Sequence, residues 1–240
     1  MLRARIRFVT WLTALVLLLG TSSASWADTV SYSQQGARLA TARIRHWFSG
    51  YGQVPLCCGT GTLVGVDGTR GLVLTVAHLF EDGKGPITVE FADGQVSGAT
   101  LLARDVQLDV AALWIYAPHG IRPLPISKAE PTLGEQLEIW GYGPERFRSF
   151  LAVAARPLLD EGEDAREFLS AQGVEDHMVT IPGDSGGPVV YSGQLVGVHW
   201  GYRGTPDDPR RAVHAAPSQL IRTWLTGRFD EKLHTRLFGY

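Results

Sequence analysis

The chain has 240 residues, of which 45% are hydrophobic and 19% charged, a composition that indicates a folded protein and excludes a disordered chain. Its formal net charge of −2 at pH 7 gives no reason to expect binding to nucleic acid. The length suits one large all-β domain or two small lobes, and 28 glycines with 13 prolines indicate many tight turns.

The first 27 residues have the order of a secretory signal peptide. Three arginines precede an apolar run from Phe8 to Leu19, and a small-residue stretch follows. We expect cleavage after Ala27 or, as a second choice, after Ala24, which would leave 19 cations and 24 anions and a formal net charge of −5 in the first case. A retained membrane anchor is the alternative, but this run spans only ~18 Å as a helix, short of the ~30 Å hydrocarbon core. We expect a secreted or periplasmic protein without stable membrane association.

Residues 28–40 are polar and small and predict a loose N-terminal arm. Runs rich in Val, Leu, Ile, Thr and Phe, separated by glycine-containing turns, then predict a first β-barrel over residues 41–116. Its strands are expected at 41–48, 58–66, 71–76, 86–91, 95–103 and 109–116.

Residues 117–132 carry four prolines and predict a linker, because such a stretch cannot pair as a central strand. A second barrel is expected over 133–216, with strands at 135–141, 149–155, 176–181, 187–191, 194–201 and 210–215. The charged segment Asp160 to Glu167 is expected to be a solvated loop or a short helix. The apolar spacing after Pro217 predicts a short packing helix within 217–240. The predicted class is therefore all-β, with two six-stranded antiparallel barrels.

The two cysteines, Cys57 and Cys58, are adjacent, which excludes a small scaffold held by disulfides. A bond between neighbours would strain the peptide, so we expect free, buried thiols. A vicinal or intermolecular bond is the alternative in an oxidising compartment. The seven histidines are scattered and no CxxC or HExxH spacing occurs, so no metal or other cofactor is expected.

Residues 183–188, Gly-Asp-Ser-Gly-Gly-Pro, are the most informative segment. A serine hydroxyl is a poor nucleophile unless a base takes its proton. Glycines around Ser185 let the backbone aim N–H groups at one point, and those of Gly183 and Ser185 are the candidate oxyanion donors. An ordinary glycine-rich hairpin is the alternative.

Two further segments supply a base and an acid. Residues 74–78, Leu-Thr-Val-Ala-His, bring His78 to the end of an apolar strand, where it can face a cleft. Asp109 lies within an apolar run, where a carboxylate is costly without a partner such as imidazole Nδ1–H. Asp105, beside Arg104, is the competing acid and is expected to be a solvated turn residue.

Residues 75–78, 109–113 and 183–188 resemble the three catalytic blocks of the trypsin/chymotrypsin superfamily, in that family's order. Residues 58–64, 140–143 and 196–201 resemble the strand before the histidine block, the Gly-Trp-Gly region and the strand lining the substrate cleft. The resemblance covers about residues 41–226. It implies a chymotrypsin-like double barrel and a secreted serine endopeptidase of bacterial type, with Ser185 as nucleophile, His78 as general base and Asp109 as its orienting partner.

The sequence also departs from the family. Leu79 stands where the animal enzymes have a cysteine that bridges to the position of Cys58, so that bridge is absent. In the family, Asp184 would pair with a new N-terminal amine. No Ile-Val-Gly-Gly-like activation sequence precedes the first barrel here, so the partner of Asp184 and the existence of a zymogen stay open.

The resemblance assigns the substrate pocket to Val179, Thr180, His199, Trp200, Gly201 and Ala212. Trypsin-like enzymes have an aspartate at the position of Val179, so cleavage after Lys or Arg is not expected. Thr180 and His199 match the pair with which glutamyl endopeptidases of the staphylococcal type grip an acidic side chain, which implies cleavage after Glu. The alternative is that His199 is buried in support of Asp109 and that Thr180 merely fills a strand.

The leading hypothesis is a monomeric secreted endopeptidase acting on protein or peptide substrates. A catalytically silent binding module on the same fold, a protease for small apolar residues and a membrane-anchored protease are the alternatives. The remaining histidines that we considered are expected to be surface or satisfied core residues: His46, His119, His177 and His214.

Overall fold

The computed structural model describes residues 35–47, 55–81, 85–143, 146–155, 169–173, 180–203 and 212–238. The expected signal peptide, the charged segment Asp160 to Glu167 and Val179 lie outside the described residues. By its internal contacts the chain divides into residues 1–35 and residues 36–240, and the architecture below is that of the second unit.

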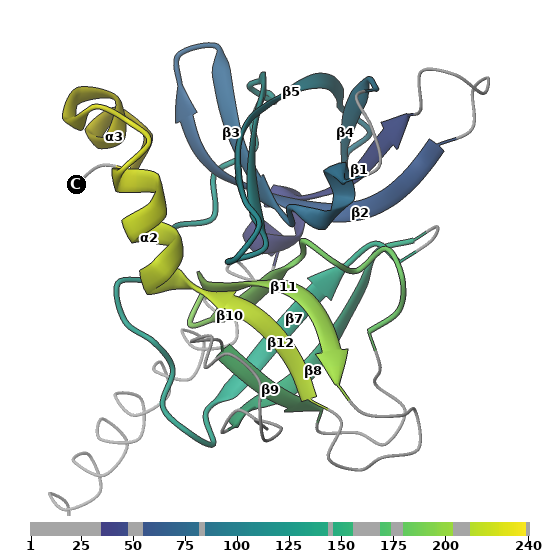
Figure 1. Ribbon diagram of the computed structural model, residues 1–240, viewed down its shortest axis with the longest axis vertical. Helices are drawn as coiled ribbons and strands as arrows, with labels where there is room; N and C mark the ends of the chain where they lie inside the picture. The colour runs from purple at the N-terminus through teal and green to yellow at the C-terminus, as the bar shows by residue number, and fades with distance from the viewer. Residues whose placement is uncertain are drawn as a thin grey trace, which may run out of the picture. The chain divides into compact units, whose positions relative to one another are not determined.

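Six antiparallel strands form the first barrel, in the order β1-β2-β3-β6-β5-β4 with β4 returning to β1 (Figure 1). Leucine, valine and isoleucine side chains fill its interior, and β4 alternates buried and half-buried residues as a strand with one core face should. The strands are β1 (Thr41–Trp47), β2 (Pro55–Asp67), β3 (Arg70–Thr75), β4 (Ile87–Phe91), β5 (Val96–Asp105) and β6 (Val110–Tyr116).

The second barrel is also closed and antiparallel, in the order β10-β11-β12-β9-β8-β7, with β10 paired to β7. Its strands are β7 (Gln136–Gly141), β8 (Arg148–Ala155), β9 (Leu169–Gly173), β10 (Pro188–Tyr191), β11 (Gln194–Arg203) and β12 (Ala212–Pro217). This architecture confirms the predicted all-β fold of two six-stranded barrels.

One strand of the second barrel differs from its predicted position. The strand that lies between β8 and β12 is β9, at 169–173, and not the expected 176–181. Thr180 and Ile181 are not in a strand, while 174–179 lie outside the described residues. The apolar run misled the prediction because its end belongs to the turn before Ser185.

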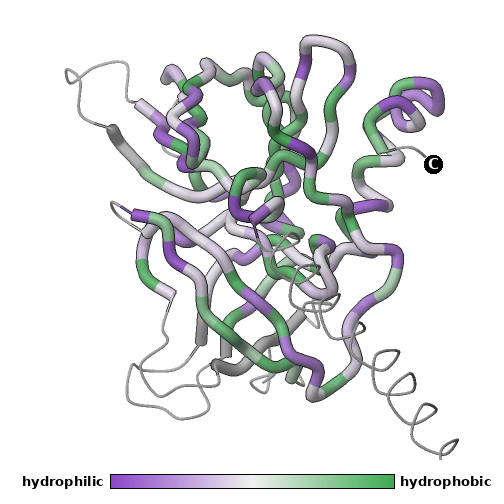
Figure 2. The backbone as a smooth tube through the Cα atoms, turned by 180° about the vertical axis from the view of Figure 1, so that it is seen from behind, coloured by the Kyte–Doolittle hydropathy of each residue, from purple (hydrophilic) through white to green (hydrophobic). Residues whose placement is uncertain are grey.

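Two hydrophobic clusters hold the barrels. Figure 2 shows hydrophobic stretches along the strands of both. One cluster lies within the second barrel around Leu137 and Ile139. The other begins inside the first barrel and continues to Leu195 and Val198 of β11, so the two barrels share one core where they meet. Burying each such Leu, Ile or Val side chain contributes about 1.5–3 kcal/mol.

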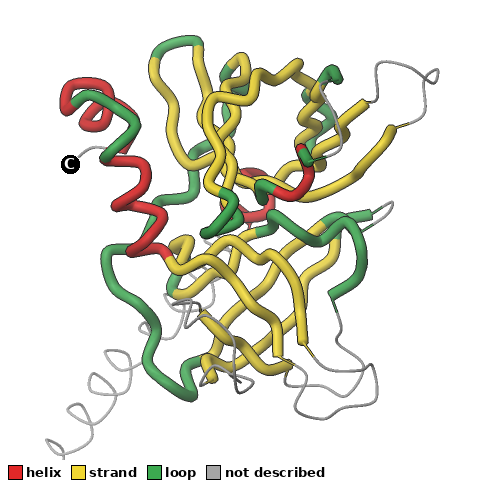
Figure 3. Tube along the Cα trace, in the orientation of Figure 1, coloured by secondary structure: helices red, strands yellow, loops and turns green. Residues whose placement is uncertain are grey.

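The linker and the C-terminal helices also join the barrels. Leu124 donates its N–H to Leu63 of β2, and Ser127 donates to Leu195 of β11. Helix α2 (Ser218–Thr226) continues from β12, and α3 (Glu231–Phe238) packs against β2, where Leu237 contacts Gly65 (Figure 3).

Three helical segments were not predicted. One is the short 3-10 helix His78–Phe80, which follows β3. Residues 35–40 are helical, whereas a loose arm was expected there. Helix α3 follows the single predicted helix, and Asp230 caps it by accepting the Leu233 N–H at 2.8 Å. Among the described residues, no helix is long and apolar enough to cross a membrane.

Candidate active site

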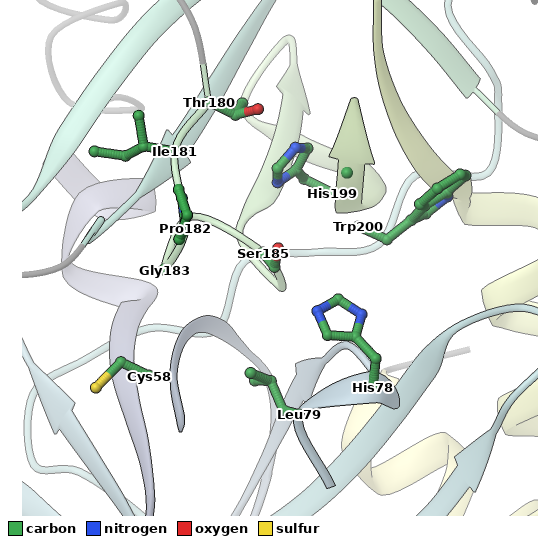
Figure 4. Close-up of a pocket in the computed structure, with 11 residues that line it drawn as sticks. Cys58, His78, Leu79, Thr180, Ile181, Pro182, Gly183, Ser185, His199 and Trp200 are labelled. Atoms are coloured by element: carbon green, nitrogen blue, oxygen red, sulfur yellow. The ribbon is translucent and has the colours of Figure 1, made fainter. Parts of the chain in front are cut away.

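A pocket lies where the two barrels meet (Figure 4). The second barrel contributes most of its wall. The lining residues are Cys58, His78 and Leu79 from the first barrel, and Thr180, Ile181, Pro182, Gly183, Ser185, His199, Trp200 and Gly201 from the second.

Strand register brings His78 and Asp109 together. Thr75 of β3 pairs with Ala111 of β6, so the 3-10 turn that follows β3 and begins at His78 lies beside Asp109, the residue directly before β6. Asp109 has φ +52°, a left-handed conformation that costs a non-glycine residue about 1–3 kcal/mol. In this conformation its carboxylate accepts the His78 backbone N–H at 2.9 Å and faces His78 Nδ1 at 2.7 Å. Both oxygens of Asp109 are therefore used to orient His78.

The hydrogen bond that His78 Nδ1 donates to Asp109 raises the pKa of His78 above the ordinary value of 6.5, against the opposing effect of burial. The competing acid, Asp105, is the last residue of β5, directly before the turn that leads to Asp109. Its Oδ1 accepts the backbone N–H groups of Gln107 and Leu108 at 3.0 and 2.9 Å. The carboxylate that faces His78 is thus Asp109.

Ser185 lies in a tight turn that glycine makes possible. Gly183 has φ +99° and Gly186 φ +89°, and a side chain on either would collide with the backbone of Gly143 or Thr60 respectively. The Ser185 carbonyl accepts the Thr60 N–H at 2.8 Å, which fixes the turn against β2. Within the described part of the chain, the N–H groups of Gly183 and Ser185 donate to no backbone carbonyl. Both are therefore available to an oxyanion.

The pocket wall beside Ser185 contains two buried polar side chains. Thr180 is 2% exposed and His199 is 1% exposed. His199 Nδ1 lies 3.3 Å from the carbonyl oxygen of Asp184, and among the described residues neither His199 Nε2 nor Thr180 Oγ1 has a hydrogen-bond partner. Burial lowers the pKa of His199 to about 4, against the opposing effect of the backbone of Asp184 and Gly201, so the imidazole is neutral at pH 7. Figure 4 shows the His199 and His78 rings on opposite sides of Ser185.

The other expected pocket residues divide into two groups. Trp200 and Gly201 line the pocket, and the Trp200 ring packs edge-on against His214 at 5.4 Å. Val179 and the side chain of Ala212 lie outside the described residues, although the backbone of Ala212 pairs with Arg203.

Sequence reasoning assigned no pocket role to Ile181 and Pro182. Their position directly before the nucleophile turn was the available signal.

His46 supports the turn that carries His78. Its side chain is buried, Nδ1 faces the Leu79 carbonyl at 3.1 Å, and Nε2 accepts the Gly85 N–H at 3.2 Å. The expectation of a satisfied core histidine matches this environment. His214 is buried, His119 is exposed, and His177 lies outside the described residues.

Cys58 lines the pocket. It is half-buried, so the expectation of a buried thiol was wrong for this residue. Leu79 is 4% exposed in the place of the family's second cysteine, and the side chain of Cys57 lies outside the described residues. In the described ranges no three His, Cys, Asp or Glu residues are grouped so that they could hold a metal.

Comparisons with known proteins agree with this geometry. The model of a family described as "Trypsin-like peptidase domain" matches residues 59–198. Trypsin 5G1 of Aedes aegypti is 35% identical over 94 residues, which cover 33% of this chain and 35% of that protein. Trypsin iota of Drosophila melanogaster is 30% identical over 143 residues, 51% of this chain and 55% of that protein. The matches thus span about a third and about half of these relatives.

The fold is shared with a solved protease. The crystal structure of the serine endoprotease from Yersinia pestis superposes with a TM-score of 0.66 at 20% identity, over 84% of this chain and 67% of the other. At that identity the superposition shows a common fold.

Proposed function

Because the chain belongs to the trypsin-like peptidase family, we propose that it is a serine endopeptidase whose nucleophile is Ser185. One observation carries the proposal: the 2.7 Å contact between His78 Nδ1 and Asp109 leaves His78 Nε2 for Ser185 in the same pocket. That arrangement supports a base held in one tautomer by a carboxylate, beside a serine whose turn exposes two N–H groups.

The reaction is acyl transfer in two halves. His78 Nε2 takes the proton of Ser185 Oγ as the oxygen bonds to the substrate carbonyl carbon, and the N–H groups of Gly183 and Ser185 bind the resulting oxyanion. The carbon–nitrogen bond then breaks, and the same proton passes from His78 to the leaving amine. Water repeats the sequence on the acyl-enzyme, and Ser185 recovers its proton. Asp109 stays ionised and stabilises the imidazolium.

For the substrate we propose a preference for Glu before the scissile bond, supported by the two unpartnered polar atoms of the pocket wall. A buried polar atom without a hydrogen bond costs about 1–3 kcal/mol, and a substrate carboxylate would satisfy both Thr180 Oγ1 and His199 Nε2. His199 Nδ1 faces a carbonyl oxygen and so carries a proton. Nε2 can then donate to a carboxylate only in the imidazolium form.

Two opposing terms decide whether His199 takes that proton. With a pKa of about 4, charging His199 at pH 7 costs about 4 kcal/mol. A carboxylate about 3–4 Å away offsets about 4–6 kcal/mol at an effective dielectric constant of ~20. The two terms are similar in size, so a bound carboxylate raises the pKa of His199, and the preference for Glu over Gln weakens as pH rises.

Two experiments test these proposals. A fluorophosphonate probe should label the wild type and not Ser185→Ala; an unlabelled wild type would favour the catalytically silent binding module. Matched peptides differing only at the residue before the cut (Glu, Gln, Leu, Lys and Ala) test the pocket. Faster cleavage after Leu or Ala than after Glu at pH 6–7 would favour a protease for small apolar residues.

We further propose export with removal of residues 1–27, supported by the arginine, apolar and small-residue order of this segment. The mass of the protein recovered outside the cytoplasm tests it. A product that begins at Asp28, or at Ser25 for the second cleavage site, supports export. A full-length product in the membrane fraction would indicate an anchored protease.

A further inference from the structure

Asp184, next to Ser185 in the chain, has no exposed surface. A buried carboxylate is unfavourable unless donors and a positive charge compensate it. Burial raises the pKa of Asp184, while hydrogen bonds and a nearby cation act in the opposite direction. The sequence leaves the partner of this carboxylate open.

The carboxylate finds its partners in the described chain itself. Oδ1 accepts the Gly143 N–H at 2.8 Å, and Oδ2 accepts the Ile181 N–H at 2.9 Å. The guanidinium of Arg148, the first residue of β8, lies 3.8 Å from Oδ2. Arg148 is half-buried, with 27% of its side chain exposed. Two backbone donors and one side-chain cation therefore surround Asp184.

These contacts hold the segment that offers the oxyanion donors. A side chain on Gly183 would collide with Gly143, so these two backbones touch directly. Asp184 binds Gly143 from one side and Ile181 from the other, and so ties the β7–β8 hairpin to the turn that contains Gly183 and Ser185. The orientation of those two N–H groups depends on an ionised Asp184 remaining in place.

We propose that Arg148 is a positioning residue that neutralises Asp184 from within the chain, so that the oxyanion hole forms without an N-terminal ammonium. The inference rests on the proposed peptidase function. Arg148 touches no reacting atom; it acts through Asp184. Its loss should lower kcat and leave KM nearly unchanged, because an oxyanion donor acts mainly in the transition state.

The test compares three variants of the full chain by active-site labelling and steady-state kinetics. Arg148→Gln should lose about 10- to 100-fold in kcat, a part of the loss seen when an oxyanion donor is deleted. Arg148→Lys should recover at least a third of wild-type kcat, because it restores the charge. Arg146→Gln, the same change at an exposed arginine two residues away, should stay within twofold of wild type.

A second arm tests the N-terminus directly and does not depend on the folding of an Arg148 variant. A Ser-Gly-Ser insertion after residue 27 displaces any terminus that cleavage creates there, and kcat should stay within twofold. A tenfold loss on insertion would overturn the inference, as would equal activity of Arg148→Gln and Arg146→Gln. A wild type that neither reacts with the probe nor cleaves peptides would instead overturn the proposed function.

Discussion

The two sides of the cleft differ in how completely their polar groups are satisfied. On the first-barrel side, both oxygens of Asp109 are occupied by His78. On the second-barrel side, buried polar atoms of Thr180 and His199 have no partner within the described chain. In the proposed function, the first side transfers protons and needs one geometry at every turnover, which groups held in place before substrate arrives provide. The second side recognises the substrate, whose carboxylate would satisfy the unpartnered atoms.

The largest effect should come from removing the proposed base, His78, on the first-barrel side or the proposed nucleophile, Ser185, on the second. Ser185→Ala or His78→Ala should lower kcat by roughly 10⁴-fold or more, since each removes a member of a unit that acts together. Neither residue is fully buried, so the melting temperature should change little. Near wild-type turnover of purified Ser185→Ala would contradict the assignment of the nucleophile.

A smaller, selective effect should come from the second-barrel side. His199→Ala should lower kcat/KM for Glu peptides by about 10- to 100-fold, and for Gln or Leu peptides by less than about threefold, because only the carboxylate needs the imidazolium. Equal losses for all peptides would mean that His199 supports the site structurally. Thr180→Val keeps the side-chain shape and removes only the hydroxyl, so it measures the contribution of Thr180 Oγ1 separately from that of His199.

The pH profile should distinguish the two histidines. His78 must be neutral to act as base, and its hydrogen bond to Asp109 raises its pKa. For an uncharged Leu or Gln peptide, kcat/KM should therefore decrease as the pH is lowered, with a midpoint above pH 6.5. Asp109→Asn should move that midpoint down and reduce kcat by roughly 10⁴-fold. The raised pKa also implies stabilisation that is present below pH 6.5 and lost as pH rises through the pKa of folded His78. A midpoint unchanged in Asp109→Asn would contradict this account.

The smallest effect should come from reductant. The chain has only two cysteines, both in β2, and Leu79 occupies the place of the family's second cysteine, so no disulfide joins the histidine turn to β2. Dithiothreitol should change kcat/KM by less than about twofold. Rapid inactivation, with Cys57 and Cys58 shown to be bonded beforehand, would show that the first-barrel side depends on a covalent link.

The sequence predicted the fold, and it carries a signal for the proposed site residues wherever the chemistry is local. The Gly-Asp-Ser-Gly-Gly-Pro segment, the strand ending at His78 and the carboxylate in an apolar run each carry their signal within a few residues. Arg148 was missed because it approaches Asp184 across 36 positions of the chain, and a lone arginine in a strand has no local signature. The contact depends on the turn between β7 and β8, which sequence spacing does not specify.

The wrong position predicted for the strand between β8 and β12 has a similar cause. Thr180 and Ile181 have strand-like propensity, but the Ile181 N–H is needed by Asp184 rather than by a neighbouring strand. A tertiary contact overrides local preference there. Helix α3 could have been found from Asp230 and the i, i+4 pair of Leu233 and Leu237, a capped amphipathic pattern of ordinary form.

The order of elements along the chain also sets a time at which the enzyme becomes active. His78 and Asp109 belong to a barrel complete at Tyr116, but Ser185 belongs to one that closes only with β12, which ends at Pro217. At 5–20 residues per second, roughly 5–20 s of synthesis separate these two points. Over this interval a nascent chain therefore carries the proposed base without a competent nucleophile. Fluorophosphonate labelling of stalled chains should begin only once β12 has left the ribosome, which would protect the synthesis machinery from its own product.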